Sequence, residues 1–342
     1  MKCWQRFSTV KTALQSHKGI VCLLLGVLLL LAVLCSLGLG STAVGWSDVF
    51  ATLAGERGGA SDIVLYVRLP RTLGALLTGV AMAVSGVIMQ GVLCNPLAGP
   101  NLIGVNAGAG FAAILCSALL PAMSGAVPIA AFGGALAASL LVFAMASRTG
   151  ASRITLVLAG VAISGMLSAG IDAVATVDPD ALVGANTFMV GGLSGVMLST
   201  LVLPGTLILV AVLAAWALSY ELDLLSLGDE VAGSLGLPVK RVRFLLLVVA
   251  AALAGSAVSF AGLIGFVGLI VPHAARFLVG EESRGLIPTA ALLGALLVVV
   301  CDLLARVLFA PFELPVGIVL SLLGGPFFLW LLIRQRGGGL HD

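Results

Sequence analysis

Residues 68–98 read RLPRTLGALLTGVAMAVSGVIMQGVLCNPLA. Arg68 and Arg71 bracket a Leu-Pro step, a mostly apolar run continues to Gln90, and an Asn-Pro-Leu-Ala turn ends the stretch. A helix of about 20 apolar residues is long enough to cross a bilayer. The stretch therefore predicts a membrane helix with a basic end, a turn at the opposite face and the start of a second helix.

The whole chain has the composition of this stretch. Of its 342 residues 60% are hydrophobic and only 9% are charged, whereas soluble proteins carry about 25% charged residues. The 44 glycines suit close packing of membrane helices. The six cysteines form no C-x-x-C pair, which favours small buried side chains over disulfides or metal ligands. We expect a single all-α, polytopic membrane domain over residues 1–342.

Apolar runs divide this domain into about ten transmembrane helices. Residues 178–195 are too short and too rich in glycine to cross, and they predict a short helix lying partway into the membrane. The predicted spans are residues 20–40, 70–90, 103–120, 129–146, 154–173, 198–218, 244–261, 265–279, 287–309 and 316–333.

The basic residues orient these helices. With residues 1–19 as a cytoplasmic tail, thirteen of the 17 basic residues fall on the cytoplasmic side, as the positive-inside rule requires. Both termini are then cytoplasmic, and Arg68 and Arg71 are outside. An odd number of helices in each half gives the halves opposite orientations, which is the plan of inverted-repeat transporters.

Arg68 and Arg71 are unusual in this topology. They are basic residues on the outer side, and Pro70 favours the first position of a helix, where positive charge is unfavourable. A surface for an acidic partner explains them, and anchoring to lipid headgroups is the alternative. Arg306 lies four residues after Asp302, so an intramembrane ion pair and a partner contact both remain open.

The polar segment 221–243 is predicted to be cytoplasmic. Its central part, residues 227–238, reads LGDEVAGSLGLP, and its glycines permit sharp turns between short helices. This pattern favours a docking element for a cytoplasmic subunit, with an ordinary solvated loop as the alternative.

Two other classes of function stay open on the residues alone. Residues 192–195 read GLSG, so Ser194 and His273 could form the dyad of an intramembrane serine protease. A secondary transporter would need intramembrane ionisable groups, and only Asp172, Asp302 and Arg306 come near that role. His273 has no second ligand at metal-binding spacing, and no Walker A phosphate loop is present.

Six motifs in order resemble the FecCD-type permeases, the membrane subunits of ABC importers for ferric siderophores, haem and cobalamin. The family-motif residues within them are Gln90, Asn95, Pro96, Pro272, His273 and Arg276. The motifs are RLPR at 68–71, SGxxxQ at 85–90, NPLAxP at 95–100, LGLP at 235–238, GFVGLIVPHxxR at 265–276 and ELPVG at 313–317.

The resemblance implies a type II ABC importer permease in a bacterial cytoplasmic (inner) membrane. Such a permease is a homodimer in membrane lipid, with two cytoplasmic ATPase subunits and an extracytoplasmic binding protein. It is not itself an enzyme, and no cofactor, metal or nucleic acid is implied. We expect a ferric siderophore as the cargo, with haem or cobalamin as alternatives.

The resemblance also implies roles for particular residues. Arg68, Arg71 and Arg306 would dock the binding protein through its glutamates. The cytoplasmic gate would lie at Ala151 and Ser152, where Ala151 replaces a threonine found in the vitamin B12 member of the family. The segment that contacts the ATPase, residues 225–239, would include Leu227, Gly228, Ala232, Leu235, Gly236, Leu237 and Pro238.

Overall fold

The computed structural model describes residues 18–40, 42, 44–56, 58–59, 61–148 and 152–336, and these residues form helices and turns without any β-strand. In chain order the elements are α2 (Lys18–Gly38), α3 (Trp46–Leu53), the π-helical η1 (Ile63–Arg68), α4 (Leu69–Leu93), η2 (Pro100–Ile103), α5 (Val105–Leu119), η3 (Ser124–Ala126), α6 (Val127–Arg148), α7 (Arg153–Val177), α8 (Pro179–Val190), α9 (Leu198–Ala217), α10 (Ser219–Ser226), α11 (Asp229–Ser234), α12 (Val239–Ala261), α13 (Val267–Val279), α14 (Ser283–Val307) and α15 (Val316–Arg336).

These elements confirm the ten predicted helices. Within the described residues, seven helical segments are long and apolar enough to cross a membrane: α2, η1 with α4, α6, α7, α9, α12 and α14. Three shorter apolar helices, α5, α13 and α15, complete the set. The 13 residues of α13 extend only about 20 Å, less than the hydrocarbon core, so it cannot span the bilayer alone.

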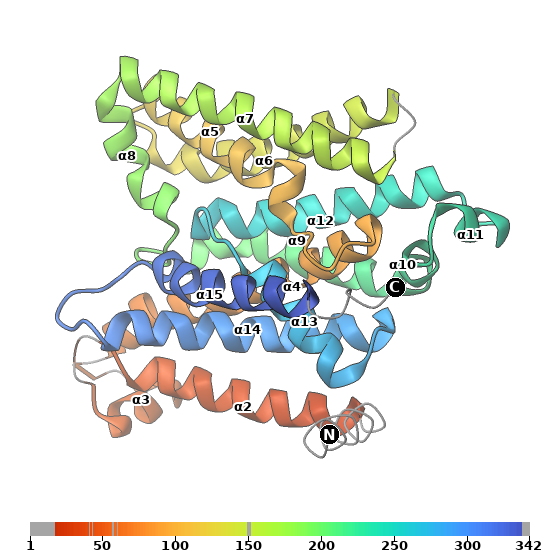
Figure 1. Ribbon diagram of the computed structural model, residues 1–342. Coiled ribbons are helices and arrows are strands. Elements are labelled where there is room, and N and C mark those ends of the chain that lie inside the picture. Colours follow the sequence, from red (N-terminus) through yellow and green to blue (C-terminus); the bar gives the residue numbers. More distant parts are fainter. Residues whose placement is uncertain are drawn as a thin grey trace.

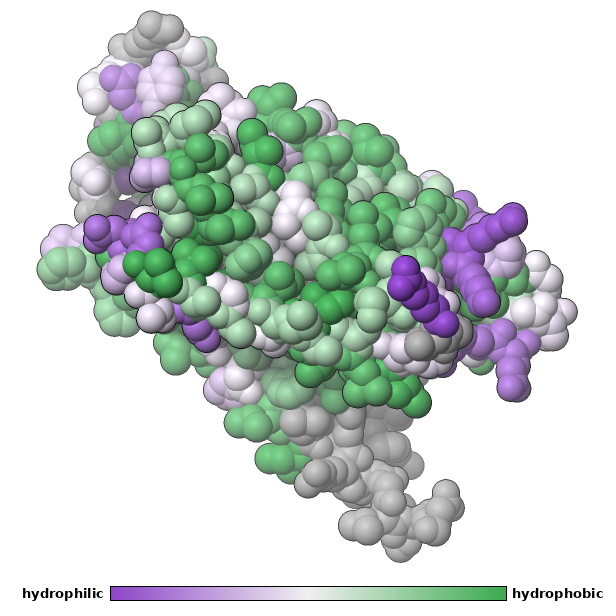
Figure 2. All heavy atoms as spheres, turned by 90° about the horizontal axis from the view of Figure 1, so that it is seen from above, coloured by the Kyte–Doolittle hydropathy of each residue, from purple (hydrophilic) through white to green (hydrophobic). Residues whose placement is uncertain are grey.

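The long helices lie side by side and give the bundle two polar ends. Helices α3 and α8 lie at one end, and α10 and α11 lie at the other (Figure 1). We call these the α3 end and the α11 end. On the face shown in Figure 2, hydrophobic side chains cover the middle of the molecule and hydrophilic ones gather at both ends. An apolar band between polar ends is the surface expected of a membrane protein.

The second predicted helix begins earlier than Pro70. Its backbone is already helical at Asp62 and passes through the π-helical turns of η1 before continuing as α4. Proline usually breaks a helix interior because it lacks a donor and crowds the preceding turn. The wider π-helical turn accommodates Pro70 without a break. The prediction that Arg68 and Arg71 flank the first helical position was therefore wrong.

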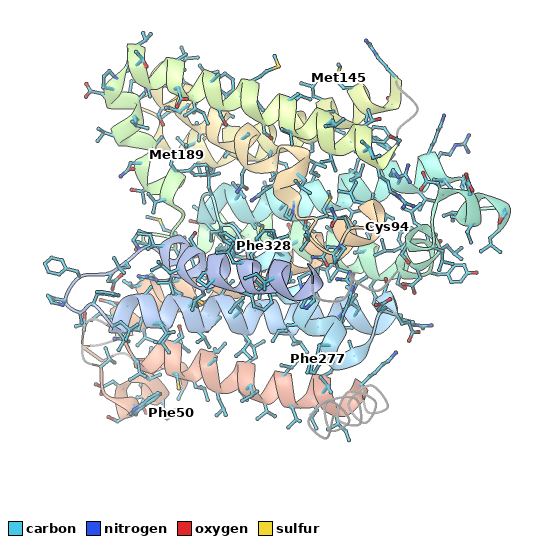
Figure 3. The ribbon with its side chains drawn as sticks, in the orientation of Figure 1. Phe50, Cys94, Met145, Met189, Phe277 and Phe328 are labelled. Carbon is cyan, nitrogen blue, oxygen red and sulfur yellow. The ribbon has the colours of Figure 1, made fainter. Side chains whose placement is uncertain are left out.

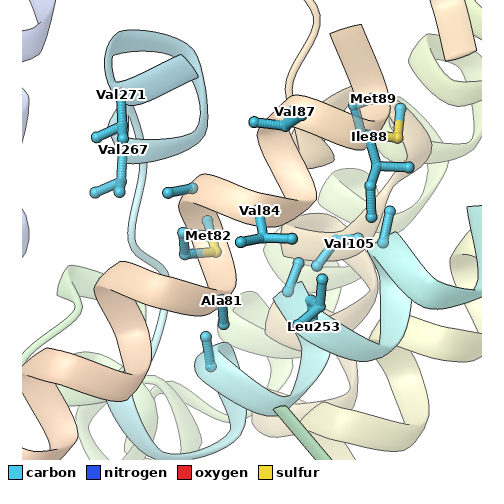
Figure 4. Close-up of a cluster of buried hydrophobic side chains, with 14 of the residues drawn as sticks. Ala81, Met82, Val84, Val87, Ile88, Met89, Val105, Leu253, Val267 and Val271 are labelled. Atoms are coloured by element: carbon cyan, nitrogen blue, oxygen red, sulfur yellow. The ribbon is translucent and has the colours of Figure 1, made fainter. Parts of the chain in front are cut away.

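Glycines allow α4 to approach its neighbours at backbone distance. A Cβ added at Gly86 would lie 2.1 Å from the carbonyl oxygen of Gly268 in α13, and one at Gly79 would lie 2.2 Å from that of Gly294 in α14. Membrane helices associate through such small-residue contacts. Buried side chains surround α4, and Figure 4 shows Met82 and Val84 of α4 in the same cluster as Leu253 of α12.

The short helix predicted within residues 178–195 is present as α8. The Asp178 side chain caps its first turn by accepting a hydrogen bond from the Ala181 N–H at 3.2 Å. The irregular backbone after α8 is paired inside the protein: the Gly192 N–H donates to the Ala261 carbonyl, and the Gly317 N–H donates to the Gly191 carbonyl. Non-helical backbone at membrane depth would require such internal pairing, and the depth of α8 in the membrane stays a prediction.

Candidate functional site

Arg68 lies in η1 at the α3 end, with its side chain against the last turn of α2. Its Nη1 donates to the carbonyl oxygens of Leu37 and Gly38, both at 2.7 Å, and its Nη2 donates to the Thr42 carbonyl at 2.5 Å. The last carbonyls of a helix have no partner within the helix and attract positive charge. Arg68 therefore stabilises the carboxyl end of α2.

Arg71 and Arg306 share one carboxylate, that of Asp302. Arg71 Nε donates to both Asp302 oxygens, at 3.0 and 3.1 Å, and Arg306 Nε lies 3.1 Å from Asp302 Oδ2. Arg71 also pairs with Glu313 in the turn between α14 and α15. Arg306 reaches back to α2, where its Nη2 donates to Ser36 Oγ at 2.6 Å. We call these five side chains, Arg68, Arg71, Asp302, Arg306 and Glu313, the arginine cluster.

The arginine cluster is buried and carries an excess of positive charge. Its three arginines are 2–5% exposed and Asp302 is fully buried, whereas the Glu313 side chain is 32% exposed. Three guanidinium groups face two carboxylates, so one positive charge is in excess. A cleft of about 40 Å³ opens onto the three arginines and Glu313. A site of about 10–15 Å³ holds one water, so this cleft has room for a carboxylate.

Arg68 and Arg71 do not face the helix N-terminal dipole that the sequence predicts. Arg68 and Arg71 do not sit at a free helix N-terminus, and Arg68 meets the carboxyl end of α2, where a cation is favourable. The unfavourable dipole that we used to infer a partner surface is therefore absent. The structure does bring all three predicted arginines together, and their docking role stays a prediction.

At the α11 end, α10 is fixed to two membrane helices. Cys94, just after α4, lies beside α10 (Figure 3), and its Sγ donates to the Ser226 carbonyl at 3.1 Å. Asp223 Oδ1 accepts a hydrogen bond from the Ser283 N–H, at the start of α14, at 3.0 Å. These contacts place α10 against the bundle and leave α11 as the outermost helix (Figure 1).

Some of the residues predicted to contact an ATPase are buried or form turns, and the others are exposed. Gly228 and Gly236 adopt positive φ angles of 115° and 85° on either side of α11, a conformation that glycine tolerates. Ala232 is buried, Leu237 packs against the core, and Pro238 immediately precedes α12. Leu227, Val231 and Leu235 are exposed. Val231 and Leu235 lie four residues apart on α11 and its C-cap, so they share one face of that helix, whereas Leu227 lies before the turn at Gly228.

The predicted gate residues are only partly described. Ala151 lies outside the described residues. Ser152 precedes α7 and caps it, because its Oγ accepts a hydrogen bond from the Thr155 N–H at 3.2 Å.

The sequence does not predict the pairing of three charged residues next to this cap. Asp229 Oδ1 accepts hydrogen bonds from Arg153 Nη2 at 2.7 Å and from Arg243 Nη2 at 2.5 Å. We call these three residues the aspartate triad. Burial alone would raise the pKa of Asp229, but the hydrogen bond from Arg243 and the charges of Arg243 and Arg153 outweigh it and hold that pKa below its ordinary value.

The family-motif residues form a third set of contacts. Gln90 of α4 accepts a hydrogen bond from Arg276 of α13, so these two motif residues are paired. Asn95 closes the turn after α4 by accepting from the Leu97 N–H at 2.9 Å. Pro96 belongs to the same turn, and Pro272 is buried within α13. The His273 ring meets Phe327 edge to face at 6.1 Å. Among the described residues no cluster could hold a metal ion.

Comparisons with known proteins agree on one family. The sequence profile of the FecCD transport family matches residues 28–334. The chain is 40% identical to the hemin transport system permease protein HmuU of Yersinia pestis, over 92% of this chain and 96% of that protein. It is 35% identical to the Fe(3+)-citrate import system permease protein YfmE of Bacillus subtilis (strain 168), over 94% and 97% of the two chains.

A solved structure supports the same assignment. A metal-chelate type ABC transporter in an inward-facing conformation matches with a TM-score of 0.80 and 29% identity, over 92% of this chain and 99% of that one. This match confirms the predicted permease fold. Full-length similarity in sequence and in structure shows that the chain belongs to the FecCD transport family.

Proposed function

We propose that the chain is the membrane-spanning permease subunit of an ABC importer for an iron complex. The observation that carries the proposal is the match over more than nine tenths of the chain to permeases named for iron-complex import. Two copies of the chain form the permease, two cytoplasmic ATPase subunits drive it, and an extracytoplasmic binding protein delivers the cargo. Alternating access in the dimer moves the complex across intact.

We propose a ferric siderophore as the cargo. Several similar proteins are named for siderophore or ferric hydroxamate transport. The haem permease HmuU and the achromobactin permease CbrC of Dickeya dadantii (strain 3937) are equally similar, at 40% identity. Haem therefore remains the first alternative, and cobalamin the second.

The proposed orientation places the α11 end in the cytoplasm of a bacterial cell. Arg148, Arg153, Lys240, Arg241 and Arg243 belong to this end, which the positive-inside rule favours for the cytoplasmic side. Lys18, at the start of α2, pairs with Glu282 between α13 and α14 at the same end. Both chain termini are then cytoplasmic, and the arginine cluster faces outward.

The exposed face of α11 is the proposed ATPase contact. Val231 and Leu235 are apolar and exposed on α11, the outermost helix of the α11 end, and exposed Leu227 lies just before it. Apolar side chains grouped at the water-facing end of a membrane protein favour a protein partner over lipid. The flanking glycine turns present this face away from the bundle.

ATP-driven uptake tests the function. The chain is reconstituted in liposomes with its ATPase and binding protein, and uptake of a ferric siderophore, hemin and cobalamin is measured with and without ATP. We expect uptake of one iron complex that requires both ATP and the ATPase. Uptake driven by a proton or sodium gradient without the ATPase would instead identify a secondary transporter.

The arginine cluster is proposed to dock an acidic residue of the binding protein. Its cleft fits a carboxylate, and its excess positive charge attracts one. Complementary charges mainly raise the rate of encounter and weaken with salt. The partner's carboxylate would compete with Glu313, the most exposed acid of the cluster.

Two substitutions with opposite expected signs test this docking. Arg68→Gln should slow association of the binding protein at low salt by up to about tenfold, because steering by charge has at least that range. Glu313→Gln should accelerate association, because it leaves more positive charge uncompensated. Arg241→Gln removes an exposed charge from the α11 end and should change nothing. Surface plasmon resonance measures the rates.

The sign of the Glu313→Gln effect decides the outcome. A damaged fold can slow binding, but it does not make binding faster. Unchanged or slower association of the Glu313→Gln variant, with wild-type thermal stability, would contradict the docking proposal.

A further inference from the structure

The aspartate triad joins three separate elements at the α11 end. Asp229 begins α11, Arg153 begins α7 and Arg243 lies in the first turns of α12. One carboxylate oxygen, Oδ1, accepts from both guanidinium groups. The position of Asp229 therefore fixes the start of α11 relative to the starts of two membrane helices.

The three side chains differ in their contact with water. The Arg243 side chain is 2% exposed, that of Arg153 is 28% exposed and that of Asp229 is 42% exposed. A buried guanidinium group is costly when it loses its carboxylate, whereas a half-exposed pair can break and reform at little cost. Arg243 therefore holds Asp229 firmly, and the contact of Asp229 with Arg153 is the weaker one.

Asp229 and Arg153 both line an open cleft. The cleft has a volume of about 610 Å³ and is lined by Leu93, by Ser152 to Ile154 at the start of α7, and by residues 227–231. Side chains do not fill the space between α11 and α7 at this point. The charge-assisted hydrogen bond between Asp229 and Arg153, at 2.7 Å, is short and directional, and it can transmit a displacement.

The other contacts of this region anchor α10 but leave the start of α11 to the triad. Cys94 and Ser283 hold α10 against α4 and α14. Gly228 separates α10 from α11 with a φ angle of 115°, which permits a change of direction between the two helices. A force on the exposed face of α11 can therefore turn α11 relative to α10 about the Asp229–Arg243 contact, and this rotation changes the geometry of the Asp229–Arg153 hydrogen bond.

We propose that Asp229 is a positioning residue that transmits the displacement of α11 to α7 through Arg153. Arg243 holds the other side of the carboxylate and serves as the fixed point. The inference rests on the proposed function, because it takes the exposed face of α11 as the surface that an ATPase moves. Without the Arg153 contact, α11 still engages the ATPase, but α7 no longer follows.

The number of ATP molecules hydrolysed per iron complex taken up tests this link. The experiment uses the full complex of permease, ATPase and binding protein in liposomes. Arg153→Gln should keep the ATPase rate within about twofold of wild type and raise the ATP consumed per cargo at least fivefold. Arg153→Lys should stay near wild type, because an ammonium group can still reach the carboxylate.

Arg148→Gln is the matched control. Arg148 is an exposed arginine at the end of α6, in the same connection between α6 and α7. Its substitution removes the same charge from the same region and should leave the ATP consumed per cargo unchanged.

The outcomes separate this inference from the proposed function. With a wild-type complex that imports, three results would overturn the link. The ATP consumed per cargo could stay at the wild-type value in Arg153→Gln, or it could rise equally in Arg148→Gln. Uptake and ATP hydrolysis could also fall in parallel in Arg153→Gln. A wild-type complex that imports none of the iron complexes would overturn the proposed function, and the link with it.

Discussion

The arginine cluster and the aspartate triad combine the same ions in different surroundings. In the cluster, Asp302 is fully buried and the three arginines are at most 5% exposed. In the triad, Arg243 is also buried, but the shared carboxylate of Asp229 is 42% exposed and its second partner, Arg153, is 28% exposed. Buried ions are stable only as a complete set, whereas exposed pairs contribute little and exchange easily with water. The cluster is therefore suited to hold helices together, and the triad to connect a part that moves.

Removal of the shared carboxylate from the arginine cluster should have the largest effect on stability. Asp302→Asn leaves Arg71 and Arg306 buried without their common partner. Breaking one side of a buried ion pair costs about 3–5 kcal/mol. We expect a marked fall in the melting temperature of the detergent-solubilised protein, measured by the loss of its helical circular dichroism.

Asp62→Asn provides the control for this substitution. Asp62 is an exposed acid close to the cluster in sequence, and changes at such surface positions usually stay within about 0.5 kcal/mol. Equal melting temperatures for Asp302→Asn and the wild type would show that the cluster does not hold the helices together.

Much of the fold could be predicted from the apolar runs. The ten helices follow from run length, because the bilayer fixes how many apolar residues a helix needs. The start of η1 was missed because Pro70 indicates a first helical turn, and no sequence pattern marked the π-helical turns that accommodate it. The start of α12 at Val239 was also missed, since its first turn carries Lys240, Arg241 and Arg243 beyond the apolar run.

The sequence predicts the three arginines of the cluster, but it does not predict which groups they contact. Arg68, Arg71 and Arg306 stood out as basic residues on the less basic side, and the structure brings them together. Their acceptors include carbonyl groups at the end of α2, which no side-chain pattern reveals. Asp229 and Arg243 lay within the polar segment that we singled out, but Arg153 comes from a different connection. The pairing of the three depends on helix packing.

Helix α4 lies between the two regions, and a substitution at its closest contact should have an intermediate effect. In Gly86→Ala, the added Cβ would lie 2.1 Å from the Gly268 carbonyl oxygen, so the backbones of α4 and α13 must separate. Overpacking of this kind costs about 1–3 kcal/mol. We expect a lower melting temperature, with a loss of uptake that exceeds the loss of ATP hydrolysis.

Gly165→Ala is the matched control within α7. A Cβ there meets no atom within 4 Å, and alanine favours helix more than glycine does. Its stability should equal or exceed that of the wild type. A Gly86→Ala variant as stable as Gly165→Ala would mean that α4 and α13 are not held at backbone distance.

The smallest expected effect is that of pH on the aspartate triad. Burial would raise the pKa of Asp229, but Arg243 and Arg153 lower it below the ordinary value of about 3.9. A carboxyl group whose pKa is lowered by folding stabilises the folded state above its unfolded pKa, and this stabilisation is lost as the pH falls through the lower, folded pKa. The triad should therefore stay intact from pH 8 down to about pH 5.5, well above the ordinary carboxyl pKa.

The ATP consumed per cargo should accordingly not change with pH over that range. The Asp229→Asn variant should consume more ATP per cargo than the wild type, by the same factor at every pH. A midpoint within the range that disappears in Asp229→Asn would place the pKa of Asp229 far above its ordinary value. The two arginines would then not hold the carboxylate ionised, and the contrast between an exchangeable triad and a fixed cluster would lose its electrostatic basis.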